Sequence, residues 1–202
     1  MSEPQSPSIG RPRTFDRERI IATAMDGYWS EGPGAISLNE LCRRASVSKP
    51  GLYREFGGED GLMDAALEHY AATVLEPLAG QIDANAPLKH VLSAMVDMLT
   101  DTTRTSPAGC LLARMQHAPG HLGPLATSRV NALREAARQQ YGELIDMAKQ
   151  RGEVSADVST TVAATMIDIQ CNALLMRMAA GEDQNMLRSQ AILAFSSLTG
   201  SA

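Results

Sequence analysis

The sequence predicts an all-α protein of about nine helices, with a small N-terminal unit of three helices and a larger helical domain behind it. Apolar residues recur at helical spacing in long segments, Gly and Pro separate these segments, and strand-like alternation is scarce. At 202 residues the chain is long enough for a small domain and a larger one with a core of its own.

The composition is typical of a globular protein, with 44% hydrophobic and 20% charged residues. No run of about 18 apolar residues occurs, and the polar N-terminal segment lacks the apolar stretch of a secretory signal. We therefore expect a cytoplasmic protein with no membrane partner. The cysteines, Cys42, Cys110 and Cys171, are widely spaced, which favours buried reduced thiols over a disulfide framework or a metal site.

Charge is unevenly distributed along the chain. Residues 1–56 hold 8 of the 18 Lys and Arg residues and 7 of the 23 Asp and Glu residues, for a net charge of +1. Residues 57–202 carry a net charge of −6. Because phosphate repels an acidic surface, this asymmetry leaves the N-terminal part as the one that can approach nucleic acid.

The first unit begins with a polar arm and a helix. Residues 1–13 are rich in Pro and Ser and predict a disordered arm that carries Arg11 and Arg13 near its end. A helix is predicted to start near Asp16, with Glu18 in its first turn, where the helix dipole favours acidic residues. The turn at 31–34, Glu-Gly-Pro-Gly, ends this helix.

Two short capped helices follow. Ser37, with Glu40 three residues later, forms the capping-box pattern that starts the first of them. Residues 46–47 are predicted to form a tight turn, and Ser48 caps the next helix, whose first turn tolerates Pro50. Two glycines end that helix after residue 56. A short helix, a tight turn and a second short helix make the helix-turn-helix pattern.

This pattern suits DNA binding, although an ordinary helical corner would share it. A helix of about 10–12 Å diameter fits the major groove, which is about 12 Å wide. The first turn of the second helix is small and polar, so its backbone can approach base edges, and the following Tyr53 and Arg54 can donate to phosphates. The candidate DNA-binding residues are Arg11, Arg13, Ser37, Arg43, Arg44, Ser48, Lys49, Pro50, Gly51, Tyr53 and Arg54.

Six further helical segments are predicted beyond Gly58. Their ranges are 60–76, 87–103, 107–117, 123–151, 157–180 and 184–198. Prolines mark the breaks between them, at positions 77, 87, 107, 119 and 124. Gly152 and Gly181 are expected to be C-caps.

The last two segments are apolar over broad faces, so they need cover on two sides. Packing within the chain can cover one side, and a two-fold partner making a four-helix bundle can cover the other. We therefore expect a homodimer. The candidate interface residues are Val162, Ile169, Leu174, Leu187, Ala191 and Phe195.

The eleven methionines recur at core-like spacing, and most are expected to be plain core. A subset can line an adaptable apolar pocket, because thioethers repack around varied ligands. The candidate pocket residues are Met95, Met98, Cys110, Met115, Met166 and Gln170. A metal sensor at Cys110 and His117 is not expected, because two ligands seven residues apart on one helix do not share an ion without a further element.

The sequence resembles the TetR family of bacterial repressors over residues 16–24, 36–41 and 45–56, and residues 109–112, Gly-Cys-Leu-Leu, resemble a motif found in one subset of that family. The resemblance implies nine or ten helices with a head made by the first three. It also implies a homodimer formed mostly by the last two helices, and a ligand pocket between head and dimer interface.

Two residues depart from the family pattern. Ser46 stands where family members usually carry Gly, which costs on the order of 1 kcal/mol if that position needs a positive φ. Glu59 stands where they often carry a lysine, and Glu59 and Asp60 are expected to repel DNA. Both departures favour an alternative in which a helical dimerisation and ligand-binding protein has a weakened or lost DNA-binding head.

The expected organisation is an arm over 1–13, a DNA-binding domain over 14–57 and a ligand-binding and dimerisation domain over 58–202. The expected function is a ligand-responsive transcriptional regulator, a repressor that a small apolar effector releases from a near-palindromic operator in double-stranded DNA. No cofactor is expected. No catalytic spacing, such as HExxH or a phosphate loop, points to an enzyme.

Overall fold

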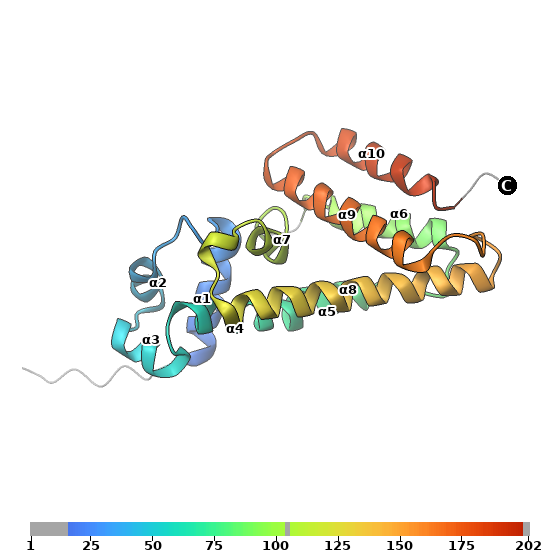
Figure 1. The fold of residues 1–202 in the computed structure, drawn as a ribbon. Coiled ribbons are helices and arrows are strands. Elements are labelled where there is room, and N and C mark those ends of the chain that lie inside the picture. Colours follow the sequence, from blue (N-terminus) through green and yellow to red (C-terminus); the bar gives the residue numbers. More distant parts are fainter. Residues whose placement is uncertain (1–15, 104–105, 200–202) are drawn as a thin grey trace, which may run out of the picture.

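The computed structural model describes residues 16–103 and 106–199, and all regular secondary structure within these ranges is helical. Figure 1 shows a small group of helices, here called the head (residues 16–58), at one end of an elongated body (residues 59–199). No helix in the described ranges is long and apolar enough to cross a membrane. The predicted arm, with Arg11 and Arg13, lies outside the described residues.

The head contains α1 (Arg17–Ser30), α2 (Leu38–Ala45) and α3 (Lys49–Phe56). The predicted caps start all three helices, because the side chains of Asp16, Ser37 and Ser48 each accept a backbone N–H bond from the first turn. Ser46 lies in the left-handed region with φ of 56°. The residue at this turn therefore does need a positive φ.

One continuous helix leads from the head along the body. It consists of α4 (Glu59–Tyr70), a π-helical turn η1 (Ala71–Leu75) and α5 (Glu76–Ala79). The predicted break at Pro77 is wrong. Pro77 lacks a backbone N–H, and it sits in the first turn of α5 directly after the π-helical turn, where the regular α-helical bonding pattern is already interrupted.

The rest of the body contains α6 (Leu88–Leu99), α7 (Leu111–Gln116), a short 3₁₀ turn η2 (Pro119–His121), α8 (Pro124–Gln150), α9 (Thr160–Ala179) and α10 (Gln184–Ser196). The predicted helix over 107–117 begins later, because Gly109 has φ of 83° and Cys110 is extended. Gly152 and Gly181 have positive φ just after α8 and α9, as expected of C-caps.

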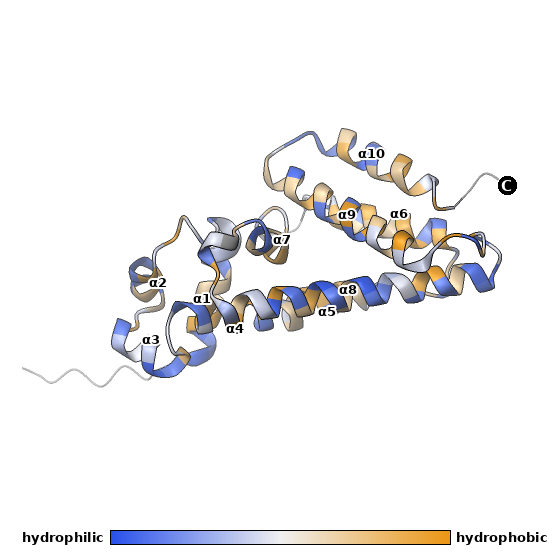
Figure 2. Ribbon diagram, in the orientation of Figure 1, coloured by the Kyte–Doolittle hydropathy of each residue, from blue (hydrophilic) through white to orange (hydrophobic). Residues whose placement is uncertain are grey.

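Two apolar cores organise the molecule. The first joins the head helices to α4, α7 and the start of α8, and the second joins α6, the end of α8, α9 and α10. Figure 2 shows apolar positions recurring along α9 and α10, while polar positions dominate the exposed side of α3. The head therefore shares its core with α4, the first helix of the body.

Candidate nucleic-acid interface and cavity

The helix-turn-helix unit rests on a compact apolar base. Leu41 and Leu52, one from each helix of the unit, are buried with α1 and α4 in the first core. The turn between the helices is closed by backbone bonds from Ser46 N to Arg43 O and from Val47 N to Cys42 O, at 3.2 and 2.9 Å. This base holds the buried face of α3 against the head, so that the other face of α3 points outward.

The outward face of α3 is polar and cationic. Lys49, Pro50, Tyr53 and Arg54 are all exposed, with Tyr53 at 48% exposure. Neither Lys49 nor Arg54 makes an ion pair with the described part of the chain. Gly51 is buried and donates its backbone N–H to the Ser48 hydroxyl at 3.2 Å. The surface can therefore present two unpaired cations to an anionic partner. Gly51 has no side chain, so the backbone of α3 can come close to that partner at this position.

Arg43 and Arg44 of α2 both hold the Glu40 carboxylate, at 2.7 Å each, and Arg44 also holds Glu31 at 2.5 Å. Hydrogen bonds from these two arginines lower the pKa of Glu40 to about 2. Glu40 therefore pairs with the two arginines. In a capping box its carboxylate would instead accept the backbone N–H of Ser37. Both arginines remain candidates for phosphate contacts, but each would share its charge with an acidic neighbour.

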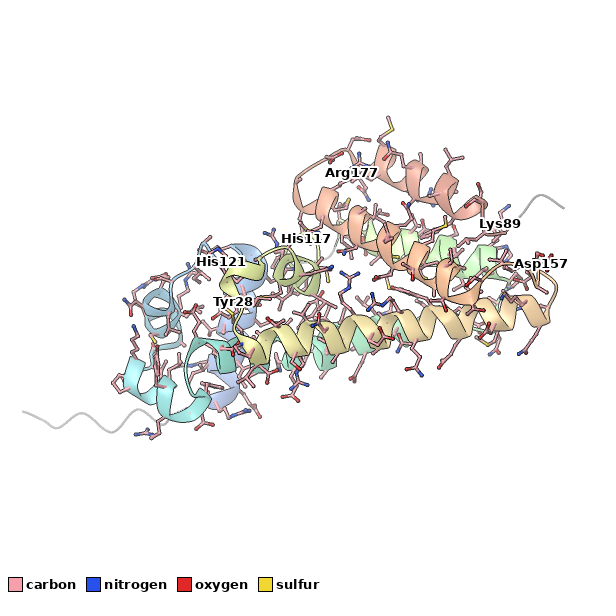
Figure 3. All side chains as sticks on the ribbon, in the orientation of Figure 1. Tyr28, Lys89, His117, His121, Asp157 and Arg177 are labelled. Carbon is pink, nitrogen blue, oxygen red and sulfur yellow. The ribbon has the colours of Figure 1, made fainter. Side chains whose placement is uncertain are left out.

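The two acidic residues in the first turn of α4, Glu59 and Asp60, interact with other groups of the protein. The Asp60 carboxylate accepts the backbone N–H groups of Leu125 and Ala126, at 2.9 and 3.0 Å, and so caps the N-terminus of α8. A Cβ atom at Gly123 would overlap this carboxylate, which explains the glycine there. Burial raises the pKa of the half-buried Glu59, with Lys49 and His121 opposing that shift. Figure 3 places His121 at the junction between head and body.

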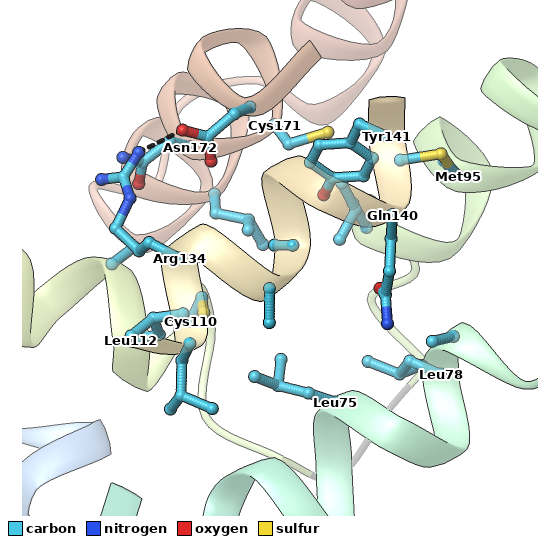
Figure 4. Close-up of a pocket in the computed structure, with 18 of the residues that line it drawn as sticks. Leu75, Leu78, Met95, Cys110, Leu112, Arg134, Gln140, Tyr141, Cys171 and Asn172 are labelled. Carbon is cyan, nitrogen blue, oxygen red and sulfur yellow. Dashed lines mark hydrogen bonds and ion pairs between the residues drawn. The ribbon is translucent and has the colours of Figure 1, made fainter. Parts of the chain in front are cut away.

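A cavity of about 320 Å³ lies in the body between α5, α6, α7, α8 and α9. Its walls are mostly apolar, and the π-helical turn and α5 supply one of them through Ala71, Leu75, Leu78 and Ala79. Figure 4 shows Leu75 and Leu78 on one side of the cavity and Arg134 and Asn172 on another. A volume of this size is typical of small-molecule pockets.

Polar groups gather where α7, α8 and α9 meet around the cavity. Arg134 of α8 forms an ion pair with Asp168 of α9, and both side chains are nearly buried. Asn172 donates its amide N–H to Gln116 Oε1 at 2.9 Å. The cavity therefore combines a broad apolar wall with a small polar end.

Three of the six predicted pocket residues line this cavity, namely Met95, Met98 and Cys110. Met115 is fully buried in the first core, and Met166 and Gln170 do not line the cavity. On α9 the lining residues are Asp168, Cys171, Asn172 and Leu175, which share one helical face. Met166 and Gln170 each lie two positions from Asp168, about 200° around the helix, and so belong to the opposite face.

The cavity thiols are shielded. Burial raises the pKa of Cys110 and Cys171, the latter to about 12, and the Tyr70 hydroxyl donates to Cys110 Sγ at 3.2 Å. Trp29 of α1 packs edge-on against Tyr70 with ring centroids 4.9 Å apart. A line of contacts therefore runs from the cavity wall to the head. Among the described residues no group of three or more His, Cys, Asp or Glu side chains could hold a metal ion.

The predicted dimer residues fall into two groups. Val162 and Ile169 are exposed, at 67% and 55%, but four others are buried in the second core of their own chain, namely Leu174, Leu187, Ala191 and Phe195. Those four face inward because α10 packs on both α6 and α9. Sequence reasoning missed the exposed Met186 and Leu193 of α10. Their spacing of seven residues was the signal for a second face.

The remaining lining residues of the cavity were also missed by sequence reasoning. Arg134 and Tyr141 lie on α8, and Leu75 lies on the continuous helix, and neither helix carries any of the six predicted pocket residues. The spacing of Arg134 and Tyr141 by seven residues on one helix is compatible with a shared face. It does not show which neighbouring helix that face meets.

Comparison with known proteins supports one family over most of the chain. A family model described as bacterial regulatory proteins of the tetR family matches residues 20–66, and one described as a tetracyclin repressor-like C-terminal domain matches residues 85–192. The chain is 28% identical over 170 residues to the HTH-type transcriptional repressor ComR of Escherichia coli K12, covering 80% of this chain and 78% of ComR. It is 21% identical over 155 residues to the regulator UidR of the same strain, covering 75% of each.

Solved structures show the same fold. A cysteine mutant of the TetR family regulator CifR, solved with a 26-base-pair operator DNA, has a TM-score of 0.72 and 25% identity, covering 91% of this chain and 97% of that chain. A TetR regulator from Chloroflexus aurantiacus has a TM-score of 0.76 and 20% identity, covering 92% and 96%. Proteins of this family are transcription factors and not enzymes. The chain therefore belongs to the TetR family of transcriptional regulators, with an N-terminal DNA-binding domain and a C-terminal ligand-binding domain.

Proposed function

We propose that this regulator is a homodimeric repressor that leaves its operator when a small, mainly apolar effector fills the cavity. The observation that carries the proposal is the continuous helix formed by α4, η1 and α5. Its first part packs on α1 and α3, and its last part lines the cavity. One continuous helix therefore contacts both the DNA-binding head and the ligand site.

In this proposal the α3 helices of a dimer enter successive major grooves of a near-palindromic operator. Lys49, Pro50 and the backbone at Gly51 lie near the bases, and Tyr53 and Arg54 contact phosphates. The outward, unpaired cations of α3 support these roles. A relative named CifR was solved with operator DNA, which supports the same partner here. Ser37, Ser48, Arg43 and Arg44, with Arg11 and Arg13 of the arm, are proposed as accessory contacts.

The proposed dimer interface is the exposed apolar face of α9 and α10. Val162 and Ile169 on α9 and Met186 and Leu193 on α10 are each more than half exposed. Pairs of residues seven apart lie on one side of a helix. A two-fold partner would bury these side chains in a four-helix bundle and would hold the two heads at a set separation.

In the proposed switch, the effector pushes on the helix wall at Leu75 and Leu78 and changes the orientation of the head. The effector must bind the DNA-incompetent state more tightly, and moving a 1:99 population to 99:1 takes about 5.5 kcal/mol of preference. The π-helical turn supports this role, since such turns are enriched at functional sites and their bonding pattern departs from that of a regular α-helix.

The test is binding of the purified protein to its own upstream DNA by gel shift, at low and moderate salt. The Lys49→Ala/Arg54→Ala variant removes two charges from α3. The Lys89→Ala/Arg138→Ala variant removes the same charges from the body, where Figure 3 shows Lys89 far from the head. We expect specific retardation that weakens steeply with salt and is lost only in the α3 variant.

Equal retardation by the two variants would contradict the placement of DNA on α3. Loss of even non-specific binding by the unaltered protein at low salt would favour the alternative of a weakened head. Specific retardation that stays unchanged when the cavity is saturated with a bound ligand would leave a DNA-binding protein but would contradict the switch.

A further inference from the structure

The segment of residues 109–112 touches both the cavity and the head. Cys110 and Leu112 line the cavity, and Figure 4 shows them side by side on one of its walls. Directly before them in the chain, the backbone carbonyl oxygen of Gly109 accepts a hydrogen bond from Nε1 of Trp29, at 3.4 Å. This short segment therefore joins a wall of the cavity to α1.

Gly109 also packs closely against α9. Its φ is 83°, and a Cβ atom at this position would lie 2.8 Å from Cβ of Ala179 and 3.0 Å from the backbone oxygen of Leu175. Leu175 lines the cavity as well. Because close-packed atoms leave no space between Gly109 and α9, a ligand that moves this part of α9 also moves Gly109.

Trp29 is linked to the same segment a second time, through Tyr70. The indole packs edge-on against the Tyr70 ring, and the Tyr70 hydroxyl donates to Sγ of Cys110 at 3.2 Å. Trp29 is only 4% exposed and Tyr70 only 2%. Side chains packed this tightly pass on a displacement, because protein interiors have low compressibility. A movement of Cys110 therefore reaches Trp29, and with it α1, which packs on α2 and α4.

The hydrogen bond between Trp29 and Gly109 is weak enough to switch. Its length of 3.4 Å exceeds the usual range for N–H···O bonds, which ends at about 3.2 Å. A small shift of the segment is therefore enough to break it. The two arrangements, bonded and broken, provide the two states that a coupling between distant sites requires.

We propose that the segment of residues 109–112 is a second path between the cavity and the head, in which Trp29 holds α1 in the DNA-binding arrangement through its bond to Gly109. An effector that displaces Cys110 and Leu112 breaks this bond and releases α1. The proposal rests on the cavity being the effector site. It goes further by naming Trp29 as a positioning residue for the response of the head.

This path differs from the one along the continuous helix. No residue of η1 or α5 is buried, whereas Cys110 and Leu111 are buried in the first core together with residues of the head. The continuous helix packs on α1 and α3, while the segment bonds to Trp29 near the C-terminal end of α1. Removing the second path should therefore remove part of the response and leave the rest.

The first test uses fluorescence. Trp29 is the only tryptophan of the chain, so the intrinsic emission of the full-length protein reports on its surroundings. Ala137→Phe adds a ring to the cavity from α8, and Ala132→Phe adds the same ring at an exposed position of that helix. Indole emission depends on the hydrogen bond of its N–H and on its neighbours. We expect Ala137→Phe to shift the emission maximum and Ala132→Phe to leave it unchanged.

The second test asks whether the contact carries the response. Trp29→Phe keeps an aromatic ring and removes the N–H donor, whereas the control Thr23→Val removes from α1 a hydroxyl that donates to Arg19 O in the same helix. Operator affinity is measured by fluorescence anisotropy with and without Ala137→Phe in each background, so that changes in basal affinity cancel. We expect Ala137→Phe to weaken binding at least about tenfold in the unaltered and Thr23→Val backgrounds, but no more than about threefold with Trp29→Phe, since coupled positions are non-additive.

Equal weakening by Ala137→Phe in the Trp29→Phe and unaltered backgrounds would overturn the second path, and the proposed repressor function would stand because filling the cavity still released the operator. An unchanged emission maximum in Ala137→Phe would also overturn the path. Unchanged operator affinity of a folded Ala137→Phe protein in every background would instead contradict the switch on which the inference rests. If Trp29→Phe does not fold, the emission test decides, because it uses the native Trp29.

Discussion

The two ends of the continuous helix over residues 59–79 differ in how firmly they are held. At the head end, α4 buries Leu62, Met63 and Leu67 almost completely. Its acidic side chains also bind α8, since Asp60 caps that helix and Asp64 pairs with Arg129 at 2.7 Å. At the cavity end, no residue of η1 or α5 is buried.

This difference suggests how the helix can transmit a signal. A segment with few buried contacts opens and shifts at low free-energy cost, whereas a segment in the core moves only with its surroundings. In the proposed switch, a ligand displaces the cavity end, and the head end passes the displacement to α1 and α3 because it is packed against both. In this proposed switch, Asp60 and Asp64 make α8 the support against which the helix would turn.

The largest expected difference between the two ends of the helix is in their contribution to the free energy of unfolding. Leu62→Ala removes a fully buried side chain, and we expect the free energy of unfolding to fall by about 2–5 kcal/mol. Leu75→Ala, at the edge of the existing cavity, should cost about 1 kcal/mol, because less apolar surface is buried there. Urea denaturation followed by circular dichroism measures both, with the exposed Leu125→Ala as the control. Equal losses at positions 62 and 75 would show that the two ends are held alike.

A smaller effect is expected at the cap that Asp60 supplies to α8. Asp60→Ala leaves two backbone N–H groups without their acceptor, so we expect a loss of about 0.5–2 kcal/mol in the free energy of unfolding. Asp26→Ala removes an exposed carboxylate from the head without removing a cap, and it should be nearly neutral. If Asp60 instead repelled DNA, as expected from the sequence, Asp60→Ala would bind the operator more tightly than Asp26→Ala does.

The smallest effect concerns Glu59, whose pKa is raised because of its burial. A carboxyl with a raised pKa in the folded state stabilises the fold fully below its unfolded pKa, and this contribution is lost as pH rises through the folded pKa. Glu59→Gln should therefore raise the thermal midpoint slightly at pH 7 and have less effect at pH 4. Thermal unfolding at both pH values measures this, with the exposed Glu55→Gln as the control. A lower midpoint for Glu59→Gln at pH 7 would contradict the raised pKa.

The sequence predicted the head well because local chemistry determines it. Ser37 and Ser48 each cap a helix through a side chain that reaches three residues along the chain, and such short-range contacts are visible in the sequence. The question of a positive φ at Ser46 came from the family resemblance, in which Gly usually occupies this position, and the structure gives Ser46 a φ of 56°. The cap that Asp60 supplies to α8 was not predicted, because the start of α8 lies 65 residues away in the sequence.

The cavity was harder to predict because α9 is apolar around much of its circumference. Met166 was as good a candidate as Cys171 from the sequence, yet only Cys171 faces the cavity. Leu187 and Phe195 were assigned to the dimer interface because either face of α10 could have met a partner. Which face turns inward depends on packing between distant helices, and periodicity alone does not contain that information.

The central claim, that filling the cavity releases DNA, can be tested with a side chain in place of a ligand. Ala137 lines the cavity from α8, and Ala132 lies on the same helix with its side chain exposed. Operator affinity is measured by fluorescence anisotropy for Ala137→Phe and Ala132→Phe, once sedimentation shows that each is folded and in the same oligomeric state as the unaltered protein. We predict that Ala137→Phe weakens operator binding at least about tenfold while Ala132→Phe does not, since lowering the DNA-competent fraction from about 99% to about 10% takes about 4 kcal/mol of bias toward the DNA-incompetent state. Unchanged operator affinity in a folded Ala137→Phe variant would contradict the claim.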